Sequence, residues 1–233
     1  MTVPLSARTI SGVPVLIGVP PRADGPLPVV LWHHGFTADA LAHAGELERC
    51  AEAGFLAIGV DAVGHGARTD HDRGARIAAS PNGALSVMMD IVDDTLSELP
   101  ALIDTLARDF AIDRSRVSIV GISMGAFLVY RAIATGLPLR AAVALLGSPD
   151  WPRDVHPGRQ LAAFRDVALL SVTAEHDVSV PPAPAKALHA ALRDAYPEAD
   201  LQHHELRGAG HLTSAAEWSE AMQMTLGWLG RHG

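Results

Sequence analysis

Short apolar runs rich in β-branched residues alternate with helix-like segments along most of this chain. Each run is typical of a buried strand; the runs cover residues 13–19, 29–32, 55–61, 116–120, 141–146, 167–172 and, in a more polar form expected of an edge strand, 201–206. Strands that alternate with helices need right-handed crossovers, which predicts an α/β fold with a mostly parallel sheet and helices on both faces. Ligands of such sheets bind at the carboxyl ends of the strands, so we expect the functional residues there.

The segments between the runs are less uniform. Residues 39–53 are typical of a helix, and apolar residues recur at helical spacing over 87–110, where we expect Pro100 to bend or interrupt the helix. Residues 67–86 are polar, charged and turn-forming, and their pattern assigns no element. Because no linker or internal repeat stands out, we expect residues 1–233 to form one domain.

A G-x-S-x-G pentapeptide occupies residues 121–125, directly after the run at 116–120 and before a helix-like segment that begins at Ala126. This context predicts a nucleophile elbow, a tight strand-to-helix turn that holds Ser123 in strained backbone angles. The flanking glycines are needed because a Cβ there would collide with the neighbouring strand and helix. The Oγ of Ser123 would then lie at the N-terminus of the helix, where the helix dipole favours negative charge.

A serine hydroxyl needs a base that removes its proton and a third group that orients the base. Asp177 follows the run at 167–172, and His211 follows the run at 201–206. The chain order is therefore nucleophile, acid, histidine. This is one of three orders in which serine triads occur in known hydrolases. We therefore predict Ser123 as the nucleophile, His211 as the base and Asp177 as the orienting acid.

Three other carboxylates are alternatives for the acid. Glu175 lies two residues nearer the strand than Asp177, where a shorter reach from the turn is expected. Asp150 also follows a strand and is a weaker alternative. Asp61 is expected to close the turn that it begins through hydrogen bonds between its side chain and the backbone.

The oxyanion that forms when Oγ attacks a carbonyl needs two N–H donors, one from the residue after the nucleophile and one from the turn after an early strand. Met124 and Phe36 occupy these places. Gly35 keeps the second turn narrow, and we expect His34 to brace it rather than to titrate. A plain turn between a strand and a helix is the alternative interpretation of residues 33–36.

Five features together resemble the α/β-hydrolase superfamily along nearly the whole chain: residues 34–36, 61–66, 121–125, Asp177 and 210–211. More narrowly, the chain looks like the small lidless carboxylesterases related to dienelactone hydrolases and prolyl-oligopeptidase catalytic domains. The resemblance implies an eight-stranded sheet and a triad of Ser123, Asp177 and His211. A dienelactone hydrolase proper would have cysteine where this chain has Ser123, and an oligopeptidase would carry a large N-terminal propeller, for which we expect no room.

Many such hydrolases insert a lid after the strand that follows the elbow. Here only residues 148–165 separate that strand from the next, which is too short for a helical cap that encloses a long acyl chain. We therefore expect no large cap domain and an open site or one covered by a short loop. The candidates for the substrate pocket are His34, Met88, Met89 and Trp151, with the Phe36 side chain beside them.

Composition excludes several partners. The formal net charge is −8, and Lys186 is the only lysine among 18 basic residues, so no clustered basic face is expected for nucleic acid. The single cysteine, Cys50, cannot form an internal disulfide and lies on the expected core face of a helix. Because neither a targeting segment nor a membrane span is recognisable, we expect a cytoplasmic protein with no membrane partner.

These observations predict a carboxylesterase-type serine hydrolase that acts on a small-molecule ester of short to medium acyl length and uses no cofactor. An acyltransferase or thioesterase with the same triad is the nearest alternative, and a non-catalytic ligand-binding hydrolase fold is another. A metal hydrolase built on His33, His34, His65 and His71 lacks H-E-x-x-H or paired Cys/His spacing, so we expect no metal. A homodimer is compatible with the sequence.

Overall fold

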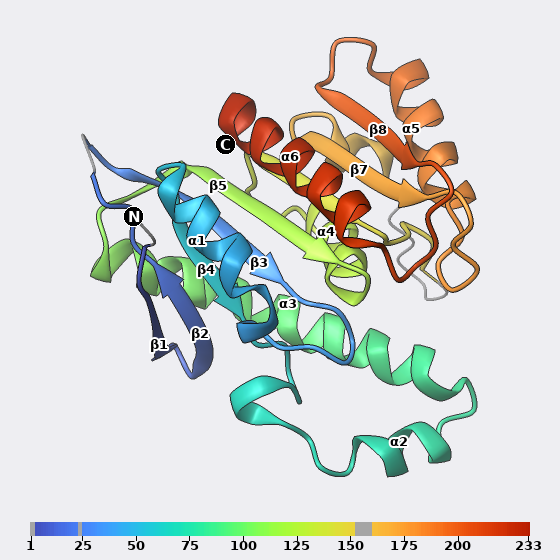
Figure 1. The fold of residues 1–233 in the computed structure, drawn as a ribbon, viewed down its shortest axis with the longest axis horizontal. Helices are drawn as coiled ribbons and strands as arrows, with labels where there is room; N and C mark the ends of the chain where they lie inside the picture. The colour runs from blue at the N-terminus through green and yellow to red at the C-terminus, as the bar shows by residue number, and fades with distance from the viewer. Residues whose placement is uncertain (1–2, 23–24, 152–159) are drawn as a thin grey trace.

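The structure, a computed structural model, describes residues 3–22, 25–151 and 160–233. Its centre is an eight-stranded sheet with the order β1-β2-β4-β3-β5-β6-β7-β8 (Figure 1). The pairs β1–β2 and β2–β4 are antiparallel and the other pairs are parallel, which confirms the predicted mostly parallel sheet. The strands are β1 (Leu5–Ile10), β2 (Val13–Gly18), β3 (Leu27–His33), β4 (Leu56–Val60), β5 (Ile112–Ile122), β6 (Ala141–Leu145), β7 (Ala168–Ala174) and β8 (Leu201–Leu206).

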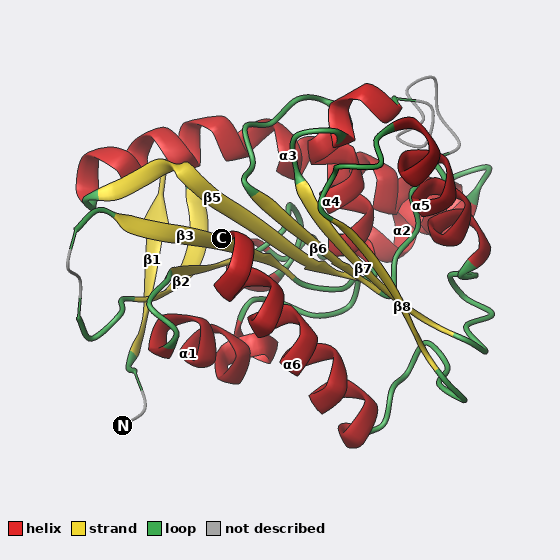
Figure 2. Cartoon of the chain, turned by 90° about the horizontal axis from the view of Figure 1, so that it is seen from above, coloured by secondary structure: helices red, strands yellow, loops and turns green. Residues whose placement is uncertain are grey.

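Helices cover both faces of the sheet, as Figure 2 shows from above. One face packs against α1 and α6, and the other packs against α3, α4 and α5. The α-helices are α1 (Ala44–Glu52), α2 (Arg73–Ala79), α3 (Gly83–Asp109), α4 (Met124–Ala134), α5 (Ala183–Ala195) and α6 (Ala215–His232). Short 3-10 turns are η1 (Leu41–His43), η2 (Gly66–Arg68) and η4 (Leu161–Phe164).

The central strand β3 shows why the apolar runs form buried strands. Successive side chains of a strand point to opposite faces of the sheet. Val29 and Leu31 pack in the core beneath α3 and α4, whereas Val30 and Trp32 pack in the core beneath α1 and α6. All four residues have an exposed fraction of 0%. A strand covered on both faces therefore needs apolar residues at every position rather than at alternate ones.

The seven strands predicted from the runs are confirmed, and β8 lies at an edge of the sheet as its polar composition indicates. The structure adds β1, whose residues 6–9 are all exposed. This strand pairs with β2 along its whole length. Backbone hydrogen bonds, rather than an apolar face, hold β1 on the sheet, and for that reason its sequence carries no strand pattern.

The predicted interruption at Pro100 is wrong, because α3 continues through this residue. Pro100 is exposed, and its neighbours Leu99 and Leu102 are fully buried. Packing of the helix on the sheet therefore outweighs the one backbone hydrogen bond that proline removes. The unassigned residues 67–86 hold part of η2, the whole of α2, which packs on α3, and the first turn of α3 (Figure 1).

The segment between β6 and β7 is described for residues 146–151 and 160–167. In those residues the only helical element is η4, so the described part of the chain contains no cap domain. This agrees with the predicted fold class. Within the described ranges, no helix has both the length and the apolar character that crossing a membrane requires.

Candidate active site

Ser123 occupies the turn between β5 and α4 with a φ of 52° and a ψ of −111°, a strained conformation for a residue with a side chain. A Cβ added to Gly121 would lie 2.0 Å from the carbonyl oxygen of Gly125 in α4, and one added to Gly125 would lie 2.3 Å from the carbonyl oxygen of His33 in β3. Both distances are far shorter than a van der Waals contact. The two glycines are therefore required by close contact with a helix and a strand, as predicted.

Three side chains at the ends of β5, β7 and β8 form one chain of hydrogen bonds. The Oγ of Ser123 lies 3.0 Å from Nε2 of His211, and Nδ1 of His211 lies 2.7 Å from Oδ2 of Asp177. Because the Asp177 carboxylate accepts the proton on Nδ1, Nε2 is left to accept the hydroxyl proton of Ser123. The second carboxylate oxygen, Oδ1, accepts the backbone N–H groups of Ser179 and Val180 at 2.9 and 2.8 Å.

The other carboxylates considered from the sequence make different contacts. Oε2 of Glu175 accepts the N–H of Gly208 at 2.8 Å, and this bond lowers the pKa of the Glu175 carboxyl. Asp61 accepts the N–H groups of Ala40 and Ala67 with its two oxygens, so its side chain joins residues on either side of the 61–64 turn rather than closing that turn as predicted. Asp150 lies in the loop after β6, where its own N–H donates to Ser148. The carboxylate hydrogen-bonded to His211 is that of Asp177.

The turn after β3 lies beside Ser123, since a Cβ on Gly35 would be 3.7 Å from the Cβ of Ser123. The buried His34 ring spans this turn and the one after β4. Its Nε2 accepts the N–H of Ala62 at 3.0 Å, so the ring proton is on Nδ1 and is donated to the carbonyl oxygen of Gly35 at 2.7 Å. Burial lowers the pKa of His34 to about 4. The ring is therefore neutral at pH 7 and braces the turn, as predicted.

The two N–H groups predicted to stabilise an oxyanion are those of Phe36 and Met124. The N–H of Phe36 and the carbonyl of Gly35 belong to one planar peptide and point in opposite directions, so the bond from His34 also fixes the direction of this N–H. Met124 is the first residue of α4, where an N–H has no acceptor within the helix. Phe36 follows Gly35, whose turn lies beside Ser123, and Met124 follows Ser123 in the chain.

The residues predicted for a substrate pocket are mostly inside the protein. Met89 and Trp151 have exposed fractions of 2% and 1%, and Met88 is partly buried against the same core. The Trp151 ring lies 6.3 Å from the Phe127 ring, centroid to centroid. The polar atoms of His34 are already bonded to the backbone. A contact of these four side chains with substrate stays a prediction.

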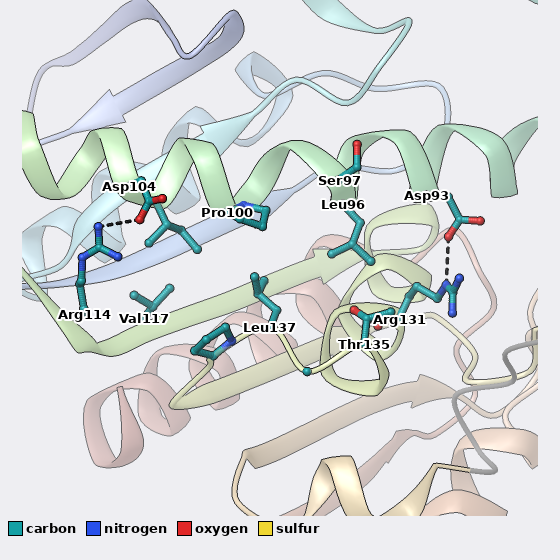
Figure 3. A pocket seen from close by; sticks show the side chains of 13 residues that line it. Asp93, Leu96, Ser97, Pro100, Asp104, Arg114, Val117, Arg131, Thr135 and Leu137 are labelled. Atoms are coloured by element: carbon teal, nitrogen blue, oxygen red, sulfur yellow. Dashed lines mark hydrogen bonds and ion pairs between the residues drawn. The ribbon is translucent and has the colours of Figure 1, made fainter.

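A cavity of about 810 Å³ lies between α3, β5 and the C-terminal part of α4 (Figure 3). Leu96, Pro100 and Leu137 give it an apolar lining, and ion pairs lie along its wall, with Asp93 2.9 Å from Arg131 and Asp104 2.6 Å from Arg114. Ser123, Asp177 and His211 do not line it. The hydrogen-bonded serine, and not this cavity, is the group equipped for chemistry.

The four histidines considered for a metal site have other environments. His71 is exposed. His33 is buried, and burial lowers its pKa to about 3. The rings of His34 and His65 lie 5.1 Å apart, centroid to centroid, and both are near backbone carbonyl groups. Among the described residues, no three or more His, Cys, Asp or Glu side chains form a group that could hold a metal ion.

A mostly parallel sheet of this order, with a strained serine after β5 and an acid and a histidine after β7 and β8, defines an α/β-hydrolase. Residues 13–221 match the model of the dienelactone hydrolase family. The chain therefore belongs to the dienelactone hydrolase family.

The chain is also similar to a protein named as an esterase and to solved structures of the same fold. The chain is 28% identical over 145 residues to Esterase YjfP of Escherichia coli (strain K12). The matched residues make up 62% of this chain and 55% of that protein. It therefore spans about half the length of the curated relatives it matches. TT1662 from Thermus thermophilus is 25% identical, with a TM-score of 0.80 over 98% of this chain and 99% of that one. A puromycin-hydrolyzing peptidase of Mycobacterium tuberculosis shares the fold, with 17% identity and a TM-score of 0.77 over 99% of this chain and 40% of that one.

Proposed function

We propose that this chain is a carboxylesterase with Ser123 as its nucleophile, His211 as its base and Asp177 as its orienting acid. The observation that carries the proposal is the continuous hydrogen-bond chain from Ser123 Oγ through His211 to Asp177. Membership of the dienelactone hydrolase family and the similarity to a protein named as an esterase support ester hydrolysis.

The contacts suggest how each group acts. Oγ of Ser123 attacks the ester carbonyl carbon while Nε2 of His211 takes the hydroxyl proton, and the carboxylate of Asp177 stabilises the imidazolium that forms. The N–H groups of Phe36 and Met124 stabilise the negative oxygen of the tetrahedral intermediate. His211 then gives its proton to the departing alcohol, which leaves an acyl group on Ser123. A water molecule, deprotonated by His211, releases the acid by the same steps in reverse.

The proposed substrates are small-molecule esters of short to medium acyl length. The support is that the described residues between β6 and β7 contain η4 and no larger helix. The His211 side chain is 23% exposed, so solvent reaches the base directly. A long acyl chain bound at such a site would gain little burial, and hydrophobic burial is what favours long chains.

The test is turnover of p-nitrophenyl butyrate with a burst of nitrophenol that the variant Ser123→Ala lacks. Ser118→Ala is a matched control, because Ser118 lies on the same strand β5 and its buried hydroxyl has no partner among the described residues. Ser118→Ala should retain the burst. Unchanged turnover in Ser123→Ala would refute the proposal.

Two further measurements separate the alternatives. Added alcohols compete with water for the acyl-enzyme. In assays on an ester and on its thioester analogue, an acyltransferase would therefore transfer the acyl group mainly to the alcohol, and a thioesterase would hydrolyse mainly the thioester. A non-catalytic binding protein would not react with a fluorophosphonate probe. We expect labelling of Ser123 by the probe and hydrolysis as the main fate of the acyl group.

A further inference from the structure

His65 lies in the turn after β4, directly beside the turn that carries Phe36. The residue is 2% exposed. Its Nδ1 lies 3.0 Å from the carbonyl oxygen of Val63, and its Nε2 is hydrogen-bonded to the carbonyl oxygen of Phe36. Both partners are carbonyl oxygens, which only accept hydrogen bonds, and a neutral imidazole carries one N–H. We assign this N–H to Nε2, which makes the closer contact, so the imidazole is the donor to Phe36.

His34 and His65 hold two consecutive peptide groups. His34 donates to the carbonyl of Gly35 and so sets the direction of the Phe36 N–H. His65 donates to the carbonyl on the other side of the Phe36 Cα. With both peptides held, the N–H of Phe36 is fixed in position as well as in direction. An oxyanion donor needs both, because it acts only within about 2.7–3.1 Å of the developing negative charge.

The turn that carries His65 is itself tied to the body of the protein. Arg68 donates two hydrogen bonds to the Glu98 carboxylate in α3, at 2.8 and 2.7 Å, and its Nη2 donates to the carbonyl of Asp61 at 2.7 Å. The N–H of Val63 donates to Thr95, also in α3, at 3.0 Å. The turn that carries His65 is therefore held against α3 by hydrogen bonds and is not a free loop.

The Phe36 side chain has weaker contacts. Its ring lies 5.7 Å from the His65 ring, edge to face, and the Arg73 guanidinium lies 5.4 Å from its centroid. Ring contacts of this kind restrain the side chain, but they do not orient the backbone N–H. The backbone here is oriented by the N–H of Ala38, which donates to the Gly35 carbonyl at 3.1 Å, and by the hydrogen bonds of the two histidines. Of these contacts, only that of His65 holds the Phe36 carbonyl.

We propose that His65 is a positioning residue for the reaction proposed above, which holds the Phe36 N–H at the oxyanion by donating from Nε2 to the Phe36 carbonyl. This inference rests on the proposed esterase function. His65 touches neither substrate nor Ser123 in this role. It acts on transition-state stabilisation, so its loss should lower kcat and leave KM nearly unchanged.

The main variant is His65→Met, which fills the site without a donor, and His65→Gln is the conservative variant, because its amide N–H can reach the same carbonyl. Removal of one oxyanion donor lowers kcat by about 10²–10³. His65→Met displaces the Phe36 N–H without removing it, so kcat should fall by about 10- to 100-fold. His65→Gln should recover most of this loss. If His65→Met does not fold, His65→Asn replaces it. The asparagine side chain is one methylene shorter than that of glutamine, so its amide does not reach the Phe36 carbonyl.

His189→Gln is the matched control. His189 is also a buried histidine, with 0% exposed, but it lies in α5 and is bonded to Ser171 in β7. This variant should lower the melting temperature without a loss of kcat. A second readout is the inhibition constant of phenylboronic acid, whose tetrahedral adduct with Ser123 places an oxygen at the oxyanion site. In His65→Met this constant should rise by about the same factor as kcat falls.

The outcomes separate the two levels of the proposal. If the wild-type chain shows no Ser123-dependent turnover and no fluorophosphonate label, the esterase function is refuted and the role of His65 with it. If the wild type is active and His65→Met keeps its kcat, or only its KM rises, the role of His65 alone is refuted. An equal loss of kcat in His189→Gln would also refute it, because the effect would then come from general loosening.

Discussion

Replacement of Asp177 by asparagine tests how the site keeps its histidine in the reactive tautomer. Oδ1 of Asp177 accepts two backbone N–H groups, from Ser179 and Val180. In Asp177→Asn, the amide oxygen must take this place, because an NH2 group cannot accept either bond. The amide NH2 then faces Nδ1 of His211 and donates to it. The ring proton moves to Nε2. A protonated Nε2 cannot accept the hydroxyl proton of Ser123.

The magnitude follows from the loss of the base. A serine triad with its acid changed to the amide loses about 10⁴ in kcat through the wrong histidine tautomer. This factor corresponds to about 5 kcal/mol of transition-state stabilisation. Both backbone bonds to Oδ1 survive in Asp177→Asn, so the melting temperature should change little. The assay is steady-state turnover of p-nitrophenyl butyrate together with a thermal melt of the same sample.

Glu175→Gln is the matched control for Asp177→Asn. It removes one negative charge two residues away, from a carboxylate that bonds Gly208 rather than His211. It should keep kcat within about 3-fold, because a solvent-exposed charge has a weak effect at this distance. A kcat of Asp177→Asn within 10-fold of wild type would refute the tautomer argument, and so would an equal fall in Glu175→Gln.

Three predictions concern stability and reactivity. Gly125→Ala should destabilise the protein by about 3 kcal/mol or more in urea unfolding, because its Cβ would lie 2.3 Å from a carbonyl oxygen; an unchanged midpoint would contradict this. Burial lowers the pKa values of His33, His34 and His189 to about 3, 4 and 3, so the unfolded chain binds protons first as pH falls below 6.5. The free energy of unfolding should therefore fall from pH 6.5 towards pH 4 by about 1.4 kcal/mol per pH unit for each histidine. His189→Gln should reduce this slope by the contribution of one histidine, about 1.4 kcal/mol per pH unit. Burial raises the pKa of Cys50 to about 12, so iodoacetamide should modify it only after denaturation, and rapid labelling of the folded protein would contradict this.

The sequence predicts the fold well where burial leaves a pattern and poorly where it does not. β3 is recognisable because both faces of the strand are covered, so every position is apolar. β1 is not, because only Ile10 points fully into the core while residues 6–9 are exposed. The interruption predicted at Pro100 does not occur, because a local rule about proline ignores the burial of the helix around it.

The same distinction applies within the candidate active site. Ser123 and His211 follow strands in a fixed order, so a local pattern is enough to bring them forward, and their separation of 88 residues along the chain does not matter. The support of the oxyanion turn has no such signal. The bond from His65 to Phe36 joins residues 29 apart, and the bonds from Arg68 to Glu98 join residues 30 apart. Each pair meets only because β3 and β4 are neighbours in the sheet and α3 packs on one face of it. A polar segment without periodicity, such as residues 67–86 with Arg68, can therefore carry contacts that hold a candidate active site in place.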